Sequence, residues 1–263
     1  MSNALTFLGT GTSQGIPVIG CNCEVCRSRD VRDKRLRTSA FVEYCGLKIL
    51  IDAGPDFRRQ MLGLPPDTGI PDAILLTHNH VDHIGGLDDV RAFNYRRQDG
   101  YKVAHPVPLY CEKHTMEGVE KMFYYAFGES DYPGIPLFDV HLIDSKPFSI
   151  NGVEIVPIRA FHASMPVLGF RFGPLAYITD ANLIPEEGFA ALEGVSTLII
   201  NTVRRTEHIS HFSLPQALDV IRRTGARNGW LTHLSHQLPP HARLCAELPA
   251  GVAPAWDGLR ITF

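Results

Sequence analysis

The first half of the chain alternates short apolar runs with turn residues, a pattern typical of strands rather than long helices. These runs predict strands at 5–9, 39–45, 47–53 and 73–77. The stretch Cys45-Gly46-Leu47 predicts a tight hairpin between the second strand and the third. The second half starts again with predicted strands, at 154–161, 169–173, 175–180, 197–203, 229–234 and 259–263.

Helices are expected at 84–97, 112–127, 213–224 and 239–248, and the second of these carries apolar residues at three-to-four spacing. Residues 63–72 are expected to be a loop within the domain. Each half therefore gives strands first and a helix later, which favours two sheets packed together with helices outside. The prediction is an α/β (α+β) fold, a four-layer αββα sandwich, formed by residues 1–263 as a single domain.

The composition is that of an ordinary globular protein, with 44% hydrophobic and 20% charged residues and a formal net charge of −3. Nucleic-acid binders usually show a basic excess, so the mild acidity argues weakly against a nucleic-acid partner. No apolar run approaches the length of a membrane span, and the chain begins with a strand-like segment instead of a signal peptide. We therefore expect a cytoplasmic protein with no membrane partner.

Three of the six cysteines, Cys21, Cys23 and Cys26, lie too close together to join distant parts of a fold as disulfides. Clustered cysteines in a chain without a secretory signal are more often metal ligands. A tetrahedral structural zinc needs a fourth ligand, and His236 is the candidate. The alternative is a chance cluster of reduced thiols. The remaining three lie in apolar stretches and are expected to be small buried hydrophobic residues: Cys45, Cys111 and Cys245.

The stretch "LTHNHVDHIGGL" crowds four metal-type side chains, His78, His80, Asp82 and His83, into six residues. It follows a predicted buried strand, and sheets of this kind place their sites at the carboxyl ends of strands. One ion cannot easily take all four side chains, whereas two ions sharing a bridging water can, about 3.5–4 Å apart. The alternative, surface or core histidines without a metal, fits a lone histidine better than this spacing.

This T-H-x-H-x-D-H motif, with "LIDAG" upstream, resembles the signature of the metallo-β-lactamase fold, which is also an αββα sandwich. The resemblance implies further ligands at later strand ends: His162, Asp180 and His233. The implied sets are His78, His80, His162 and Asp180 for one ion, and Asp82, His83, Asp180 and His233 for the other. Asp52 is either a partner that orients the histidine loop or an ordinary strand-end turn residue.

The segment "LGTGTSQGIPVIGCNCEVC" and the tail "THLSHQ" resemble one branch of that fold. The branch is the phosphoribosyl 1,2-cyclic phosphate phosphodiesterases of phosphonate breakdown (PhnP-type). It implies a structural zinc on the three cysteines and His236, a catalytic histidine at His211, and a homodimer. The glycine-rich loop passes close to a bound phosphate or packs under the metal loop. Residues 96–141 look longer than in that branch, which puts the particular substrate in doubt.

The resemblance implies that two divalent ions, manganese or zinc, lower the pKa of a bridging water, and that the hydroxide attacks a small cyclic phosphodiester. The candidate catalytic residues are His211, Asp82 and His208. His211 donates a proton to the leaving oxygen or binds the substrate phosphate, and His208 is the alternative for either part. Arg91 either holds a second phosphate or is a solvated helix residue.

Several rival functions share parts of this pattern. A tRNA 3′-processing endonuclease shares the "FLGTGTSQGIP" start and the two-metal motif, but no glycine- and proline-rich arm is present here. A glyoxalase II-like thioesterase does not call for the cysteine loop. A true lactamase has a cysteine ligand with no counterpart before Asp180. A non-catalytic, metal-stabilised binding protein predicts missing ligands, whereas all seven candidates are present.

Overall fold

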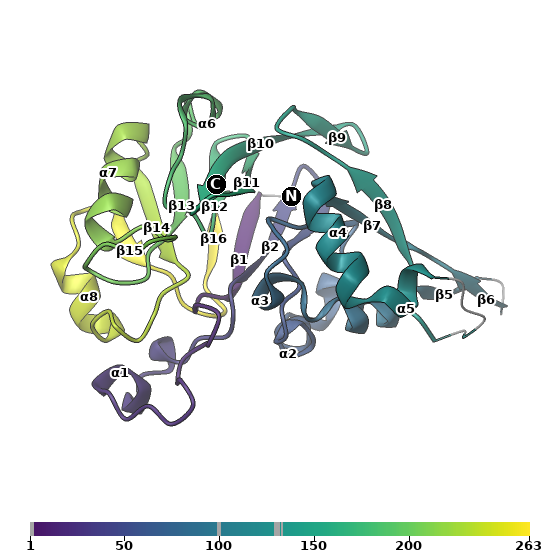
Figure 1. The fold of residues 1–263 in the computed structure, drawn as a ribbon, viewed down its shortest axis with the longest axis horizontal. Helices are drawn as coiled ribbons and strands as arrows, with labels where there is room; N and C mark the ends of the chain where they lie inside the picture. Colours follow the sequence, from purple (N-terminus) through teal and green to yellow (C-terminus); the bar gives the residue numbers. More distant parts are fainter. Residues whose placement is uncertain (1–2, 99–100, 129–131, 133) are drawn as a thin grey trace.

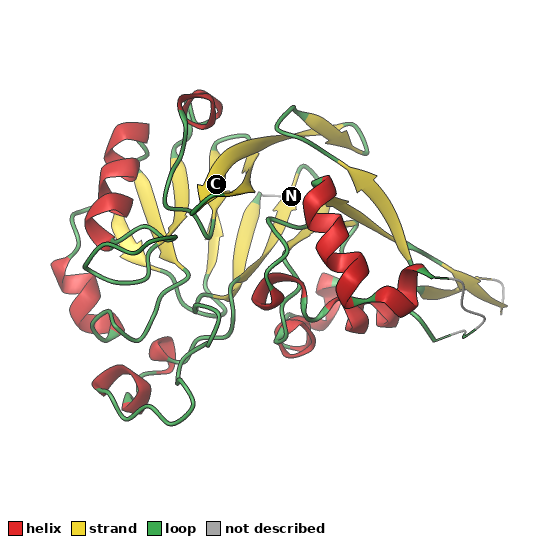
Figure 2. Cartoon of the chain, in the orientation of Figure 1, coloured by secondary structure: helices red, strands yellow, loops and turns green. Residues whose placement is uncertain are grey.

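The computed structural model describes residues 3–98, 101–128, 132 and 134–263. Two seven-stranded sheets pack face to face, and helices lie on the outer side of each (Figures 1 and 2), which confirms the αββα sandwich. The first sheet has the order β16-β1-β2-β3-β4-β7-β8. Its strands are β1 (Ala4–Gly9), β2 (Ser39–Tyr44), β3 (Leu47–Ile51), β4 (Ala73–Leu75), β7 (Val107–Cys111), β8 (Phe138–Leu142) and β16 (Arg260–Thr262).

The second sheet has the order β15-β14-β13-β12-β11-β10-β9 and comes from the other half of the chain. Its strands are β9 (Phe148–Ile150), β10 (Val153–His162), β11 (Met165–Phe172), β12 (Leu175–Ile178), β13 (Thr197–Asn201), β14 (Asn228–Thr232) and β15 (Val252–Pro254). A separate hairpin pairs β5 (Tyr95–Gln98) with β6 (Tyr101–Ala104). The C-terminal strand β16 returns to the first sheet beside β1, so the two ends of the chain are hydrogen-bonded neighbours.

The helices are short, and no described helix is long and apolar enough to cross a membrane. They are α1 (Glu24–Arg27), α2 (Phe57–Leu62), α3 (Val81–Ile84), α4 (Lys113–Met122), α5 (Tyr124–Phe127), α6 (Glu186–Ala191), α7 (Leu214–Thr224) and α8 (His241–Glu247). The described residues also form three 3₁₀ turns: η1 (Val31–Asp33), η2 (Pro66–Thr68) and η3 (Leu87–Phe93).

Burial on both faces explains why the central strands read as continuous apolar runs instead of alternating ones. In β3, Ile49 and Ile51 enter the core between the sheets, while Leu50 packs on the helix side. A third apolar core lies between the second sheet and its helices, around Ile178, Ile200 and Val220. Successive side chains of a strand point to opposite faces of the sheet. Each central strand therefore contributes both to the core between the sheets and to a core between its sheet and the helices.

Most predicted elements are confirmed, and the helix predicted at 112–127 is confirmed as α4 and α5, separated at Phe123. Ser213 begins α7 with a capping box to Gln216. The helix predicted at 84–97 is wrong, because only a 3₁₀ segment forms before β5. Asn94 ends it: its buried side chain bonds the backbone of Leu137 and His105 instead of continuing the helix.

Two cysteine predictions are also wrong. Cys111 is buried in β7 as expected, but Cys45 and Cys245 are exposed. Cys45 stands in the predicted hairpin turn at φ 50°, followed by Gly46 at φ 87°, so its side chain leaves the sheet. The strands β5, β6, β7, β8, β9 and β15 lie outside the predicted strands; they are short, and several carry proline or charged residues.

The end of β3 is joined closely to the loop after β4 that carries the histidine motif. The amide of Ala53 donates to the carbonyl of His83 at 2.7 Å, and the amide of Gly86 donates to the carbonyl of Ala53 at 2.8 Å. A Cβ on Gly54 would lie 1.9 Å from the carbonyl oxygen of Asp82. The glycine of the "LIDAG" segment therefore lets the backbone of the histidine loop approach the strand end.

Replacing this glycine tests that contact. We expect Gly54→Ala to lower the free energy of unfolding by about 1–3 kcal/mol, because the new methyl group must displace the histidine loop. Urea unfolding measures the change. Gly63→Ala is the matched control, since its Cβ would meet nothing closer than 3.3 Å and its φ is −80°. Equal stability losses in both variants would contradict the argument.

Candidate metal centre

Seven candidate ligands from both sheets converge where several strands end. Their side-chain donor atoms form two groups, and within each group all of them lie within 4.8 Å of one another. The first group is His78, His80, His162 and Asp180, and the second is Asp82, His83, Asp180 and His233. The structure thus brings together both sets that the sequence resemblance implied, with Asp180 in each.

Asp180 divides its two oxygens between the groups. Oδ2 lies 3.7 Å from Nε2 of His78, in the first group. Oδ1 lies 3.3 Å from Nε2 of His83 and 3.1 Å from Nε2 of His233, in the second. Asp82 completes the second group, with Oδ2 3.3 Å from Nε2 of His83. A carboxylate in this position can bridge two cations.

The hydrogen bonds of the histidines leave their Nε2 lone pairs facing the same space. His83 Nδ1 donates to Asp52 Oδ2 at 2.7 Å, and His162 Nδ1 donates to the Ser210 carbonyl at 2.6 Å, because these oxygens can only accept. The Thr77 hydroxyl donates to Asp52, so His78 Nδ1 donates in turn to Thr77 Oγ1 at 2.9 Å. Nδ1 donation fixes the tautomer that ligates a metal through Nε2.

Several buried nitrogen atoms of this centre have no hydrogen-bond partner in the described part of the protein, which indicates that a further ligand belongs there. Nε2 of His78, of His83 and of His233 has no hydrogen-bond partner among the described residues. Such orphaned groups are costly unless something binds them. A set of imidazoles with carboxylates is a donor set for divalent zinc, manganese or iron, so these residues fit metal ions.

The electrostatics of the pocket favour positive charge. Burial opposes a charge on His83, yet the carboxylates around it, Asp180 foremost, raise its pKa well above the ordinary value. Burial also favours the neutral form of Asp180, yet His233 and His83 hold its pKa well below the usual range. A cation placed here would supply the positive charge that these buried carboxylates require.

Strained backbone positions aim three of the side chains. Asp52, Asp180 and His233 follow β3, β12 and β14, and each has a positive φ, of 60°, 53° and 52°. Residues other than glycine rarely adopt this left-handed conformation, which recurs at functional sites. The turn that ends each strand therefore points its side chain into the site instead of along the sheet.

His211 and His208 line the same space. The His211 ring lies 4.5 Å from that of His162, 4.8 Å from that of His233 and 5.1 Å from that of His208. Burial lowers the pKa of His211 to about 3, and neighbouring histidines add to the effect. His211 is therefore neutral without substrate, and only a nearby negative charge would let it act as an acid.

Arg91 stands apart from these groups. It lies on η3 instead of a full helix, is half exposed and pairs with Asp88 at 2.8 Å. Asp88 also accepts the hydroxyl of Tyr125 at 2.5 Å, which anchors the pair on the surface. The structure thus gives Arg91 a surface partner and supplies no support for its role in phosphate binding.

Helix α4 belongs to the 96–141 region that looks longer than in the PhnP-type branch, and it contacts the histidine loop. Asn79, between the first two histidines, donates to the carbonyl of His114, and His114 Nε2 lies 3.1 Å from the carbonyl of Pro166. Just before the helix, Glu112 makes two hydrogen bonds to Arg159, at 2.5 and 2.7 Å, and both side chains are largely buried. Helix α4 is therefore fastened to the histidine loop and to the β10–β11 hairpin.

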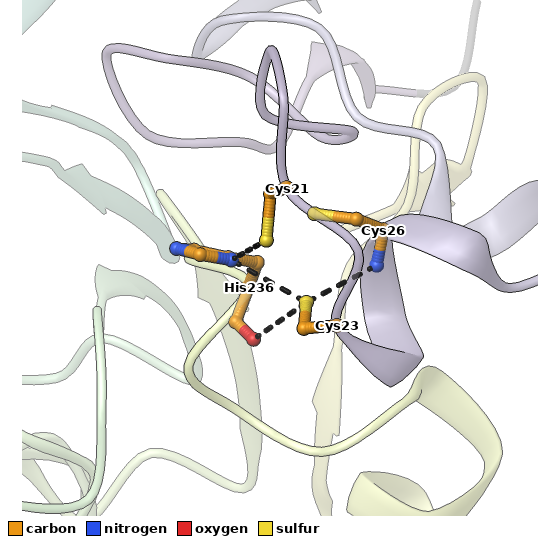
Figure 3. Close-up of side chains that lie close together, drawn as sticks. All are labelled: Cys21, Cys23, Cys26 and His236. Atoms are coloured by element: carbon orange, nitrogen blue, oxygen red, sulfur yellow. Dashed lines mark hydrogen bonds between the residues drawn. The ribbon is translucent and has the colours of Figure 1, made fainter.

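The predicted cysteine group also comes together (Figure 3). The donor atoms of Cys21, Cys23, Cys26 and His236 lie within 4.8 Å of one another, and His236 Nδ1 is 3.2 Å from Cys21 Sγ. Although burial raises the pKa of Cys23, the amide of Cys26 and the ring of His236 lower it to about 6. Thiolate sulfurs and one imidazole in this arrangement fit a structural zinc.

The glycine-rich loop connects the two candidate metal sites. Leu234 lies between His233 and His236; its amide donates to Thr10 and its carbonyl accepts from Thr12. A Cβ on Gly9 would lie 1.9 Å from the carbonyl oxygen of Arg37. These contacts favour the interpretation that the loop packs beneath the metal residues.

Comparison with known proteins adds the family. A family model described as a beta-lactamase superfamily domain matches residues 48–234. The chain belongs to this superfamily. Together with the two donor groups, membership makes the protein a metal-dependent hydrolase.

Three similar proteins carry different names. A crystal structure of a new diphosphatase from the PhnP family is 37% identical, with a TM-score of 0.88, over 99% of this chain and 98% of the other. A Porphyromonas gingivalis protein named octanoyltransferase is 39% identical over 96% of this chain, which spans only 50% of that protein's length. Zinc-bound PqqB from Methylobacterium extorquens is 20% identical, with a TM-score of 0.76, over 99% and 100% of the two chains, and shares the fold.

The role of Asp52 can be tested through metal affinity. We expect Asp52→Asn to weaken metal binding about 10–100-fold, because the amide cannot hold both Thr77 and the His83 tautomer as the carboxylate does. Competition with a chromophoric chelator measures the affinity. Asp72→Asn, in an exposed loop where the carboxylate accepts the Lys48 amide, is the control. Equal affinities of both variants and the parent protein would disprove the role.

The cysteine group predicts a separate effect. Cys21→Ala should remove one zinc ion per chain and lower the melting temperature, because three remaining ligands no longer complete a tetrahedral site. Elemental analysis and thermal unfolding measure both. Cys245→Ala, at an exposed cysteine outside the group, should leave both values unchanged. An unaltered zinc content in Cys21→Ala would count against the site.

Proposed function

We propose that the protein hydrolyses a small phosphodiester, such as a phosphoribosyl cyclic phosphate, at a centre of two divalent manganese or zinc ions. The observation that carries this proposal is the carboxylate of Asp180 divided between two histidine groups, with His211 beside both. Two ions there, when bound, would lower the pKa of a water molecule and neutralise charge on the phosphate oxygens. The proposal includes a structural zinc on the cysteine group.

The protein's own residues supply positioning and proton transfer. A phosphate bound beside His211 brings negative charge to a buried neutral imidazole, which raises its pKa and lets it protonate the leaving oxygen. His208, whose pKa burial and Arg204 lower, lies behind it as a second imidazole.

A diphosphate linkage is the second candidate substrate. The 37% identical structure with near-complete mutual coverage is described as a diphosphatase, so phosphorus chemistry is supported more directly than acyl chemistry. Phosphodiester and diphosphate hydrolysis need the same attack on phosphorus and differ in the leaving group. The octanoyltransferase name belongs to a protein of which this chain spans half, so an octanoyl ester belongs in the test panel.

The test is a substrate panel with the manganese- or zinc-loaded protein. Cyclic ribose phosphates, bis-aryl phosphodiesters and a dinucleoside diphosphate are compared with a thioester, an octanoyl ester, a β-lactam and a tRNA precursor. We expect metal-dependent cleavage of the small phosphodiesters, abolished in His78→Ala because the first metal group loses a ligand. His105→Ala, outside both groups, should retain it.

The panel also separates the alternatives. Turnover of the diphosphate alone would select the second candidate. Turnover of only the thioester, the octanoyl ester or the tRNA precursor would leave the metal-dependent hydrolase in place and reject phosphodiester hydrolysis.

A further inference from the structure

Asn182 bonds two loops of the metal centre that belong to different parts of the chain. It lies in the connection between β12 and α6. Its Oδ1 accepts the amide of Ala163 at 2.8 Å, and its Nδ2 donates to the carbonyl of Ile209 at 3.2 Å. Ala163 directly follows the candidate ligand His162, and Ile209 lies two residues before His211. One side-chain amide therefore links the turn beside His162 to the loop that carries His211.

The backbone that presents Asn182 is itself fixed. The Asn182 amide donates to the Phe161 carbonyl at 2.9 Å. The Phe212 amide donates to the Ala181 carbonyl at 2.7 Å. The buried side chain of Asn201 bonds both the amide and the carbonyl of Ala181. Because this backbone is held in place, the reach of the short Asn182 side chain sets the spacing of the loops on either side.

The turn between β10 and β11 needs support from outside. It consists of Ala163 and Ser164 and joins His162 to Met165, which pair across the hairpin. Ala163 has φ 54°, in the left-handed region that residues other than glycine rarely adopt. Two-residue hairpin turns with a positive φ at the first position usually carry glycine there. The bond from the Ala163 amide to Asn182 therefore helps to hold a strained conformation directly beside a metal ligand.

The loop on the other side, residues 202–213, is held weakly near its tip. The Ile209 side chain is 85% exposed, so packing does little to fix this part of the loop. From outside the loop, Asn182 bonds the Ile209 carbonyl and His162 bonds the Ser210 carbonyl. Because His162 is a candidate metal ligand, the bond from Asn182 is a tether that does not involve the metal residues.

We propose that Asn182 is a positioning residue that sets the place of the His211 ring relative to His162. The two rings lie 4.5 Å apart, centroid to centroid. Both side-chain bonds of Asn182 go to backbone groups, so it acts on the reaction through His211. This inference rests on the proposed function, in which His211 protonates the leaving oxygen. Proton transfer needs a donor within hydrogen-bond reach, and a displacement of about 1 Å can cost roughly 100-fold in rate.

Two phosphodiesters with different leaving groups test the positioning role in the manganese-loaded protein. A cyclic ribose phosphate releases an alkoxide that needs a proton, whereas bis(p-nitrophenyl) phosphate releases a stable p-nitrophenolate. In Asn182→Ala we expect kcat for the cyclic ribose phosphate to fall roughly 10–100-fold at a nearly unchanged KM. The aryl phosphodiester should lose much less. A merely structural role predicts the same loss for both substrates, and that result would overturn the proposal.

Comparison with His211→Ala tests whether Asn182 acts through that ring. On the cyclic ribose phosphate, the double variant N182A/H211A should be no slower than His211→Ala alone, because both substitutions affect one step. Asn228→Ala is the matched control. The Asn228 side chain donates to Thr197 Oγ1 at 3.4 Å, at the ends of β14 and β13 opposite the metal residues. This variant should keep both activities, and full additivity of the first two substitutions would count against the proposal.

Hydrogen–deuterium exchange of the metal-loaded protein provides a readout without turnover. In Asn182→Ala, the amides of residues 202–213 should exchange several-fold faster than in the parent chain, at unchanged metal content. Asn182→Asp separates the two contacts, since a carboxylate can accept from Ala163 but cannot donate to Ile209. It should keep the β10–β11 turn protected and release the loop. Exchange in Asn182→Ala as slow as in the parent chain would reject the positioning role.

The outcomes separate this inference from the proposed function. A parent chain that cleaves neither phosphodiester would reject the proposed function, and the exchange measurement would still decide whether Asn182 holds the loop. A parent chain that cleaves both, with Asn182→Ala equally active on both, would leave the proposed function in place and reject the positioning role.

Discussion

A charged carboxylate in a protein core is stable only if positive groups surround it, and Asp180 imposes this condition on the whole site. Its two oxygens face different histidine groups, so the positive charge must come from two directions. The strand ends meet there. Asp180 and His233 adopt an unfavourable left-handed backbone conformation, which points their side chains into the site. The unpartnered imidazole nitrogens face the same space, and cations satisfy both requirements at once.

Local spacing made much of this centre predictable from sequence. The four candidate ligands between His78 and His83 belong to one short segment, so the sequence alone places them close together. Asp180 and His233 are single residues at strand ends, and only the family resemblance singled them out. Ser210 had no signal, because it contributes a backbone carbonyl that any residue possesses. The helix predicted at 84–97 is wrong for a related reason: Asn94 bonds Leu137, which lies 43 positions away, and the local pattern carries no sign of that contact.

The superfamily sets the fold and the metal-binding residues, and the surroundings of those residues select the substrate. Proteins named for a diphosphatase, an octanoyltransferase and PqqB share the architecture. In this chain, α4 is bonded both to the histidine loop through Asn79 and, at its start, to β10 through Glu112 and Arg159. Within the segment that departs from the PhnP-type pattern, α4 is therefore held in place against the histidine loop.

The short turn from His233 to His236 also limits how this protein can change over evolution. His233 belongs to the histidine and aspartate centre, and His236 belongs to the cysteine group. Between them, the backbone of Leu234 is hydrogen-bonded to Thr10 and Thr12 of the glycine-rich loop. Inserting or deleting any residue in this turn would move one of the two histidines away from its metal site. The number of residues in this turn should therefore vary less than their identities, and length variation should accumulate in exposed connections such as residues 63–72.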